Sequence, residues 1–270
     1  MLAFDLVVAL LPVLLFLGGL VFMDSFKLVR PRTVFLALVW GAVAAAASFA
    51  IHEWGFGDVT ADTLKRVVAP ITEESAKGVF VVWMLARRRL GFAVDAAIAG
   101  FAVGAGFAVI ENLQYLQALD HGRVWLWVVR GFGTAVLHGA TTCVFAMLAR
   151  GMWERHRDRR ARGIALAWIA AVSIHAAYNN LLLPPVLATL MLLLLLPLLI
   201  VLVYQRSEAA TREWVTTGLD LDLELLQLVS SDAFVHTRFG TYLREIRERL
   251  RGPIAADMFC LLRVELELAV

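Results

Sequence analysis

Long apolar stretches limit how this chain can fold more than any other feature. Of its 270 residues, 60% are hydrophobic and only 18% are charged. About 20 apolar residues in a helix cross the hydrocarbon core of a bilayer, and about seven stretches of this kind follow one another. They are 2–22, 33–51, 67–86, 93–117, 124–149, 163–183 and 186–204. We therefore predict an all-α, polytopic transmembrane helix bundle and exclude an ordinary soluble domain.

The charges between these stretches predict an orientation. The loops at 24–32 and 150–162 are basic, as is the run 87–89, whereas those near 52–66 and 118–123 carry mixed charge. Cytoplasmic loops carry an excess of Lys and Arg. The alternation of basic and mixed loops places the N-terminus outside and the C-terminus in the cytoplasm.

The chain changes character after the last apolar stretch. Residues 205–270 are rich in charged side chains and leucine, which predicts a cytoplasmic, mostly helical C-terminal appendage beside a transmembrane domain at 1–204. No chemistry is evident in the appendage, so a regulatory or oligomerising role is open, as is the oligomeric state. Two cysteines, Cys143 and Cys260, lack metal-ligand spacing. No basic tract indicates nucleic acid, so we expect no nucleic-acid partner.

Two glutamates and a lysine interrupt the third apolar stretch. Glu73, Glu74 and Lys77 stand between Val67-Val68 and Val79–Trp83. An ionisable side chain at bilayer depth costs roughly 2.5–3.5 kcal/mol, so three in one span need partners or a water-filled cavity. On a helix, both glutamates lie within one turn of the lysine, which can pair with one of them. An internal ion pair leaves the second glutamate unexplained, which favours a functional site.

Other polar residues share the depth of this pair. At the helical rise, Glu73 and Glu74 lie roughly 9–11 Å from the outer end of their span, Glu111 roughly 9 Å and His175 roughly 12 Å. His138 is deeper, at roughly 20 Å. Different helices thus direct acids and imidazoles toward the outer half of the membrane. The spacing predicts one polar site at their meeting point, although each histidine alone could equally be a packing residue.

Two further residues have positions that indicate supporting roles. His175 and Asn179 are one turn apart on a helix, so the amide could orient the imidazole or donate to a developing oxyanion. Arg130 lies roughly 9 Å from the outer end of its span, where it could neutralise a carboxylate.

The same residues also suit a proton-coupled transporter, which uses intramembrane acids, His and Arg as relays. Against that reading, the halves of the chain show no inverted repeat, and the acids cluster at one depth. A non-catalytic relative that binds membrane proteins is a further alternative.

The polar residues resemble the motifs of a known family. Glu73–Lys77 resembles the EExxK motif of the PrsW-type intramembrane proteases, within the superfamily of CAAX prenyl endopeptidases and bacteriocin-processing membrane proteases. Gly106–Asn112 is similar to the GFAxxEN core of the second motif, Arg130 with His138 to the third, and His175–Asn179 to the HxxxN of the fourth. The resemblance covers 67–183. Val103-Gly104 replaces the usual Phe-Ala, a difference that affects packing more than chemistry.

This resemblance implies a protease of the bacterial cytoplasmic membrane that cuts membrane-anchored proteins. The expected partners are the lipid bilayer and a single-span membrane protein, such as an anti-sigma factor, cut near the extracytoplasmic boundary. The outer-half depth of the glutamates agrees with that side.

The residues point to hydrolysis by activated water. We expect Glu73 or Glu74 to act as general base, while the other orients its partner or binds metal. His138 and His175 would polarise the carbonyl or hold the water, and Asn179 would supply the oxyanion donor.

Further residues would support or extend this site. Lys77, Glu111, Asn112 and Arg130 are the supporting residues. Glu73, Glu111, His138 and His175 have the ligand types for Zn²⁺, but a metal-free glutamate mechanism fits them equally well.

Overall fold

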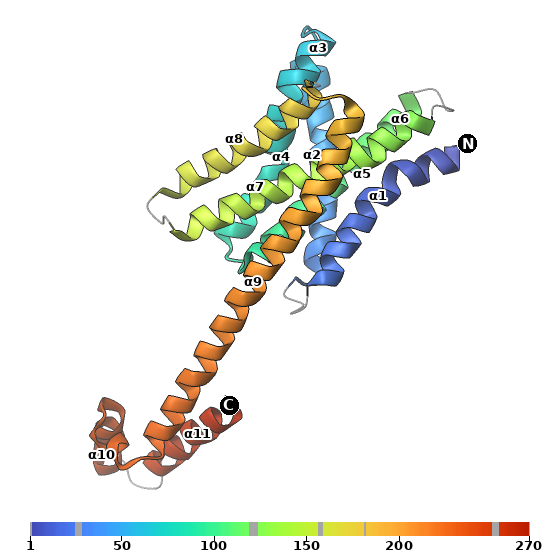
Figure 1. Cartoon of the computed structure of the whole chain (residues 1–270). Coiled ribbons are helices and arrows are strands. Elements are labelled where there is room, and N and C mark those ends of the chain that lie inside the picture. The colour runs from blue at the N-terminus through green and yellow to red at the C-terminus, as the bar shows by residue number, and fades with distance from the viewer. Residues whose placement is uncertain are drawn as a thin grey trace. The chain divides into compact units, whose positions relative to one another are not determined.

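The computed structural model describes residues 2–24, 29–118, 124–155, 159–180, 182–249 and 254–269, and these contain helices and no strand. The helices are α1 (Leu2–Met23), α2 (Pro31–Gly55), α3 (Ala61–Thr63), α4 (Ala69–Ala86), α5 (Ala93–Ala118), α6 (Val124–Val128), α7 (Val136–Arg155), α8 (Arg160–Asn179), α9 (Pro185–Val229), α10 (Arg238–Arg249) and α11 (Ile254–Ala269). Two π-helical segments, η1 (Leu64–Val68) and η2 (Val129–Ala135), lead into α4 and α7, and η4 (Asp232–His236) is a 3₁₀ helix. Figure 1 shows their order along the chain.

The prediction of an all-α membrane bundle is confirmed. Five described helical segments are long and apolar enough to cross a bilayer: Phe4–Phe22, Pro31–Gly55, Ala93–Gln117, Trp125–Trp153 and Arg160–Asn179. Helix α4 carries three charged residues, and the apolar part of α9 is the shorter segment Pro185–Leu199. The structure thus has a helix in each of the seven predicted stretches, while five satisfy length and apolarity together.

Several helix boundaries differ from the predicted ones. Part of the polar segment 52–66 is helical, because α2 continues to Gly55 and the turns of α3 and η1 precede α4. Helix α9 continues to Val229, well beyond the predicted end at 204. The leucine-rich sequence after Pro197 favours a helix and contains no proline before Pro253.

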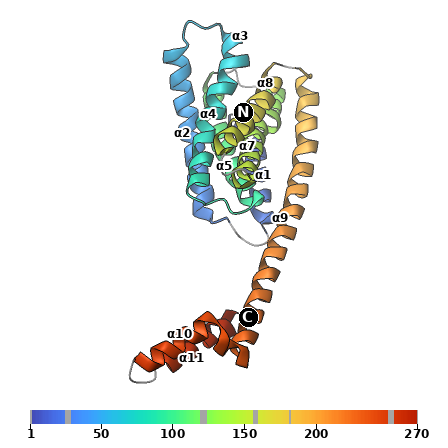
Figure 2. The same ribbon diagram turned by 90° about the vertical axis from the view of Figure 1, so that its left-hand side faces the viewer.

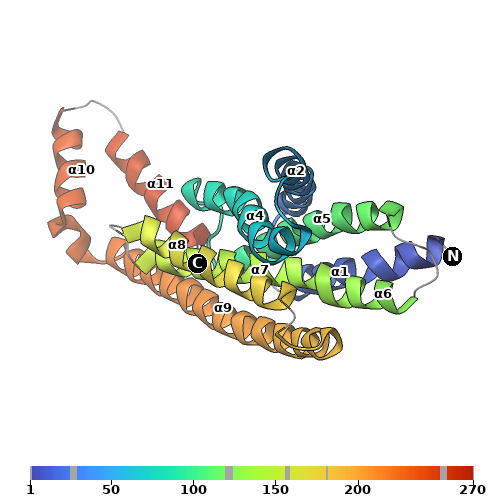
Figure 3. The same cartoon turned by 90° about the horizontal axis from the view of Figure 1, so that it is seen from above.

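Helix α5 is the centre of the bundle. In its apolar part 83% of the residues are buried, against 33% in α1 and 28% in α2. It packs against α1, α2 and α7, and α7 lies between α5 and α8 (Figure 3). A methyl group at Gly104 would collide with the carbonyl of His138, and one at Gly106 with Leu38. These two glycines therefore bring the backbones of α7 and α2 against α5.

Helix α4 lies against α2, α7 and α8 (Figure 2). Pro70 occupies its first turn, where a missing N–H is tolerated. After the helix ends, Arg88 adopts a left-handed conformation with φ of 54°. The buried face of α4 carries Glu73, Glu74 and Lys77, which are directed toward α5, α7 and α8.

The described chain divides into two compact units, Met1–Ser207 and Glu208–Val270. The first contains the bundle. The second has its own small core, in which Val229, Phe234 and Leu243 pack against apolar residues of α11. The functional division at residue 204, with a cytoplasmic appendage, stays a prediction.

Candidate active site

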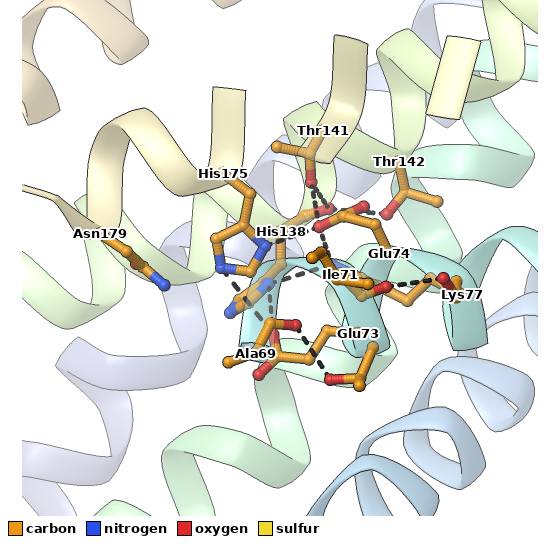
Figure 4. A network of polar contacts seen from close by, with 12 residues as sticks. Ala69, Ile71, Glu73, Glu74, Lys77, His138, Thr141, Thr142, His175 and Asn179 are labelled. Carbon is orange, nitrogen blue, oxygen red and sulfur yellow. Dashed lines mark hydrogen bonds and ion pairs between the residues drawn. The ribbon is translucent and has the colours of Figure 1, made fainter. Parts of the chain in front are cut away.

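Helices α4, α5, α7 and α8 bring the predicted acids and histidines to one place (Figure 4). Helix α4 contributes Glu73 and Glu74, α5 contributes Glu111, and α7 and α8 contribute His138 and His175. The two imidazole rings meet edge to face, with centroids 5.0 Å apart. Residues more than a hundred positions apart thus form one buried polar cluster.

One oxygen of the Glu74 carboxylate has three partners. Its Oε1 atom lies 2.5 Å from Nζ of Lys77, 3.1 Å from the hydroxyl of Thr141 and 2.8 Å from Nδ1 of His175. The lysine is completely buried and Glu74 is 3% exposed. Lys77 therefore pairs with the second glutamate of the motif. Removing one partner of such a buried pair leaves an uncompensated charge, at a cost of about 3–5 kcal/mol.

The carboxylate of Glu73 has a different environment. Its Oε2 atom is buried, and no group among the described residues donates a hydrogen bond to it. It lies 3.8 Å from Nε2 of His175 and 4.0 Å from Nδ1 of His138. A buried acceptor without a donor is rare. The missing partner of this oxygen is therefore expected to be water, a metal ion or the substrate.

Each histidine is held on its outer side by a carboxylate. Nε2 of His138 lies 2.9 Å from Oε2 of Glu111, and Nδ1 of His175 lies 2.8 Å from Glu74. A carboxylate accepts hydrogen bonds, so the facing nitrogen carries the proton. The remaining nitrogens, Nδ1 of His138 and Nε2 of His175, face Glu73. Nδ1 of His138 also accepts a hydrogen bond from Nζ of Lys77 at 3.2 Å.

Arg130 lies beside Glu111, with its Nη2 atom 3.4 Å from Oε2. Its Nε donates to the side-chain oxygen of Asn112 at 3.1 Å, and its guanidinium covers the ring of Tyr115 at 3.5 Å. Asn112 in turn donates to the carbonyl of Ala9 in α1. Arg130 thus lies where it can neutralise the carboxylate of Glu111. Asn112 orients the guanidinium of Arg130 through this hydrogen bond.

Asn179 lies one turn beyond His175, as predicted, and its amide donates to the carbonyl of Lys65 at 3.0 Å. The neighbouring Asn180 donates to the carbonyl of Arg66 at 3.2 Å. These two bonds attach the end of α8 to η1. The donor group of Asn179 is thus in use in this structure.

A cavity of about 1070 Å³ opens onto the cluster, and Glu73, Glu111, His138 and His175 line it. Its walls also include residues between the end of α2 and the start of α4, among them His52 and Lys65. Glu74 is not among the described lining residues and lies behind Glu73. The two adjacent glutamates therefore differ in access to the cavity.

The sequence analysis did not single out every residue that shapes this site. Thr141 supports Glu74, Tyr115 stacks on Arg130, and Phe107 packs on His138 with centroids 4.9 Å apart. Thr141 lies one turn from His138, which is a weak signal. Phe107 lies one turn from Glu111 and shares a helix stripe with it, which is also a weak signal. The stacking of Tyr115 on Arg130 depends on interhelical packing.

The donor set fits a divalent metal ion. Glu73, His138 and His175 each offer one ligand atom, and the three atoms lie within 4.8 Å of one another. The Glu73 oxygen that accepts no hydrogen bond and the imidazole nitrogens that face it belong to one carboxylate and two histidines. This set of ligand types is known from catalytic zinc sites. Glu111, also predicted as a ligand, lies on the outer side of His138, where a carboxylate orients a metal-binding histidine.

The comparison with known proteins agrees with the residue pattern. A family model described as PrsW family intramembrane metalloprotease matches residues 30–204. This range extends from the end of the first loop into α9 and contains every residue of the site. No curated protein and no solved structure matches the chain.

Proposed function

Because the chain belongs to the PrsW family of intramembrane metalloproteases, and so is a membrane-embedded peptidase, we propose that Glu73, His138 and His175 hold and activate the attacking water. The substrate is a membrane-anchored protein, and the reaction is hydrolysis of one of its peptide bonds.

One observation carries this assignment. Oε2 of Glu73 is a buried acceptor with no donor among the described residues, next to two imidazole nitrogens and on a cavity wall. The oxygen of Glu74 has three partners and lies behind it. Of the adjacent pair, Glu73 is therefore the glutamate that meets water, and Glu74 holds His175 and Lys77.

The surrounding groups prepare this centre. Glu74 and Glu111 fix the orientation of the two imidazoles and direct one nitrogen of each inward. Arg130 balances the charge of Glu111. Such fixed groups need no rearrangement when charge develops on the substrate carbonyl. The inward nitrogens are placed to hold the water or polarise that carbonyl.

Glu73, His138 and His175 would hold a zinc ion, since catalytic zinc takes three protein ligands of these types and keeps a fourth position open. When bound, the metal would act as a Lewis acid and assist the deprotonation of water. A metal-free route uses the same oxygen of Glu73 as general base. The family description favours the metal.

The substrate has an apolar route to the cavity. A groove of about 760 Å³ runs between α7, α8 and α9, lined by aliphatic residues such as Ala140, Ile174, Met191 and Leu195. Tyr178 lines both this apolar groove and the catalytic cavity. A single transmembrane helix of the substrate in the groove would thus place its end beside the site.

We further propose that the cut lies near the extracytoplasmic boundary, as the loop charges and the wall of the cavity between α2 and α4 support. Helical peptide bonds are shielded in the membrane, so unwinding and water are easier near the interface. The family resemblance makes an anti-sigma factor in a bacterial cytoplasmic membrane the leading substrate. The intact acid and histidine set favours an active protease over a transporter or a non-catalytic relative.

Mass spectrometry of membrane fragments tests this function. Cells with the wild-type chain should accumulate a membrane-retained fragment that is absent from cells with Glu73→Ala. The new end should map to the extracytoplasmic boundary of a single-span protein. Identical fragments in both cells, or cuts on the cytoplasmic side, would contradict the proposal.

A further inference from the structure

A second polar cavity lies at the end of the bundle where α4 ends and α8 begins. It has a volume of about 390 Å³ and is lined by three arginines, Arg88, Arg150 and Arg160. Its remaining walls include Leu85, Leu90 and Trp153. None of the described lining residues is acidic. A concave site with three guanidinium groups and an apolar wall is built for an anion attached to an apolar body.

The arginines are positioned by the fold rather than spread over a surface. Arg88 occupies the left-handed position after α4. The guanidinium of Arg150 donates to the carbonyl of Gly91 in the turn between α4 and α5. That of Arg160 covers the ring of Trp153 at 4.5 Å, and its buried Nε has no hydrogen-bond partner among the described residues.

A described carboxylate acts on one arginine of this cluster. Asp95 lies nearby, accepts the amide N–H groups of Gly91 and Phe92 at 2.9 Å each, and attracts Arg150. Because the described lining residues include three guanidinium groups and no carboxylate, the cavity is basic. The first turn of α8 begins at Arg160, and the positive end of its helix dipole adds to that charge.

We propose that this arginine cavity binds the phosphate of an anionic phospholipid headgroup. Guanidinium groups bind phosphate through paired hydrogen bonds, and basic cavities between membrane helices favour anionic headgroups. A free phosphate ion shares this chemistry. The apolar wall formed by Leu85, Leu90 and Trp153, at an end of membrane-spanning helices, favours the lipid.

A lipid bound in the arginine cavity would contact the helices that carry the active site. The arginines come from the end of α4, from α7 and from the start of α8, which are the helices that carry Glu73, His138 and His175. A bound phosphate would tie together the ends of these helices opposite the active site. The binding itself does not depend on the protease chemistry.

The test uses the full-length protein in detergent, titrated with dioleoylphosphatidylglycerol, with the zwitterionic phosphatidylcholine of the same chains, and with inorganic phosphate. Binding is followed by native mass spectrometry and by the thermal midpoint. Phosphatidylglycerol should bind and raise the midpoint of the wild type. In the double variant Arg88→Gln, Arg160→Gln the affinity should fall about 25-fold, from about fivefold for each guanidinium. Arg150 is kept because it also supports Gly91.

Arg87→Gln is the matched control, since Arg87 belongs to the same turn and is not a lining residue. It should retain wild-type affinity. Equal affinity of the double variant and the wild type would overturn the proposal, as would equal binding of phosphatidylcholine. Stabilisation by inorganic phosphate as strong as that by phosphatidylglycerol would replace the lipid with a soluble anion.

A second measurement on the wild type keeps the proposal testable if the double variant does not fold. Photoactivatable phosphatidylglycerol should cross-link to peptides that contain residues 85–91 or 150–160, and excess unlabelled phosphatidylglycerol should abolish these cross-links. Cross-links spread evenly over all helices would contradict a specific site.

Discussion

Oε1 of Glu74 lies 2.8 Å from Nδ1 of His175. The same oxygen meets Lys77 and Thr141, whereas the neighbouring Glu73 keeps a buried oxygen without a donor among the described residues. Two adjacent glutamates therefore have separate tasks. One holds a histidine and a lysine in place, and the other faces the cavity.

This separation predicts different effects on stability for the two conservative substitutions. Glu74→Gln should lower the free energy of unfolding by about 3–5 kcal/mol, because Lys77 is left as a buried charge without its carboxylate. In protein freed of metal, Glu73→Gln should leave stability near the wild-type value, because no described residue donates a hydrogen bond to its buried Oε2 atom. Thermal unfolding in detergent gives the comparison.

Removing the lysine as well provides the control for this effect. The double variant Glu74→Gln, Lys77→Met should recover much of the lost stability, since no charge remains unpaired. Equal destabilisation by Glu73→Gln and Glu74→Gln would contradict the separation of roles.

Metal content should depend on Glu73, His138 and His175. We expect about one zinc ion per chain in wild-type protein and none in His175→Ala, because the site would lose one of its three ligands. Glu111→Gln should weaken metal affinity about 10–100-fold, since Glu111 orients His138. Metal analysis with zinc titration measures both.

The control for metal binding is His236→Ala, which removes a histidine of the second compact unit. It should keep the wild-type zinc content. Full proteolytic activity in wild-type protein freed of metal would exclude the zinc route and leave Glu73 as a metal-free base.

Close packing of α5 and α7 should be sensitive to one added methyl group. Gly104→Ala would place that group against the carbonyl of His138 and push α7 away, at a cost of about 1–3 kcal/mol. Activity should fall as well, because His138 moves with its helix. Gly151→Ala, in α7 with no atom within 4 Å of the added group, should not destabilise the protein, since alanine is the better helix former. Unfolding and cleavage measurements would separate the two variants, and equal behaviour would contradict this packing.

The apolar groove should contact the substrate helix. A cysteine at Ile174, which lines the groove, should cross-link to a cysteine in the transmembrane helix of a substrate. A cysteine at Ile169, on α8 and outside the groove, should not. Cys260→Ser removes the exposed native thiol in both variants. Cross-linking from Ile169 alone would place the substrate elsewhere, and acyl-chain labelling at Ile174 without substrate would assign the groove to lipid.

The sequence contained most of the fold and part of the site. Apolar length alone predicts the membrane helices, and helical spacing brings Glu73, Glu111, His138 and His175 to a common region. The division of labour between Glu73 and Glu74 could not be predicted. Adjacent side chains on a helix point about 100° apart, and the partner of each depends on how α7 and α8 pack.

The two π-helical segments could not be predicted from the sequence either. The π-helical segment η1 precedes α4, and η2 contains Arg130, so counting at a constant rise gives only approximate depths. The sequence spacing relates Asn179 to His175. The structure adds that its amide is bonded to Lys65, a partner more than a hundred residues away.

The most direct test of the central claim is the rate of substrate cleavage in vesicles that contain purified wild-type or Glu73→Gln protein. In the absence of metal, both proteins should have the same thermal stability. We predict that Glu73→Gln lowers the single-turnover rate by at least about 100-fold, as expected when the group that activates water is lost. Cleavage by Glu73→Gln at the wild-type rate would show that Glu73 does not activate the water.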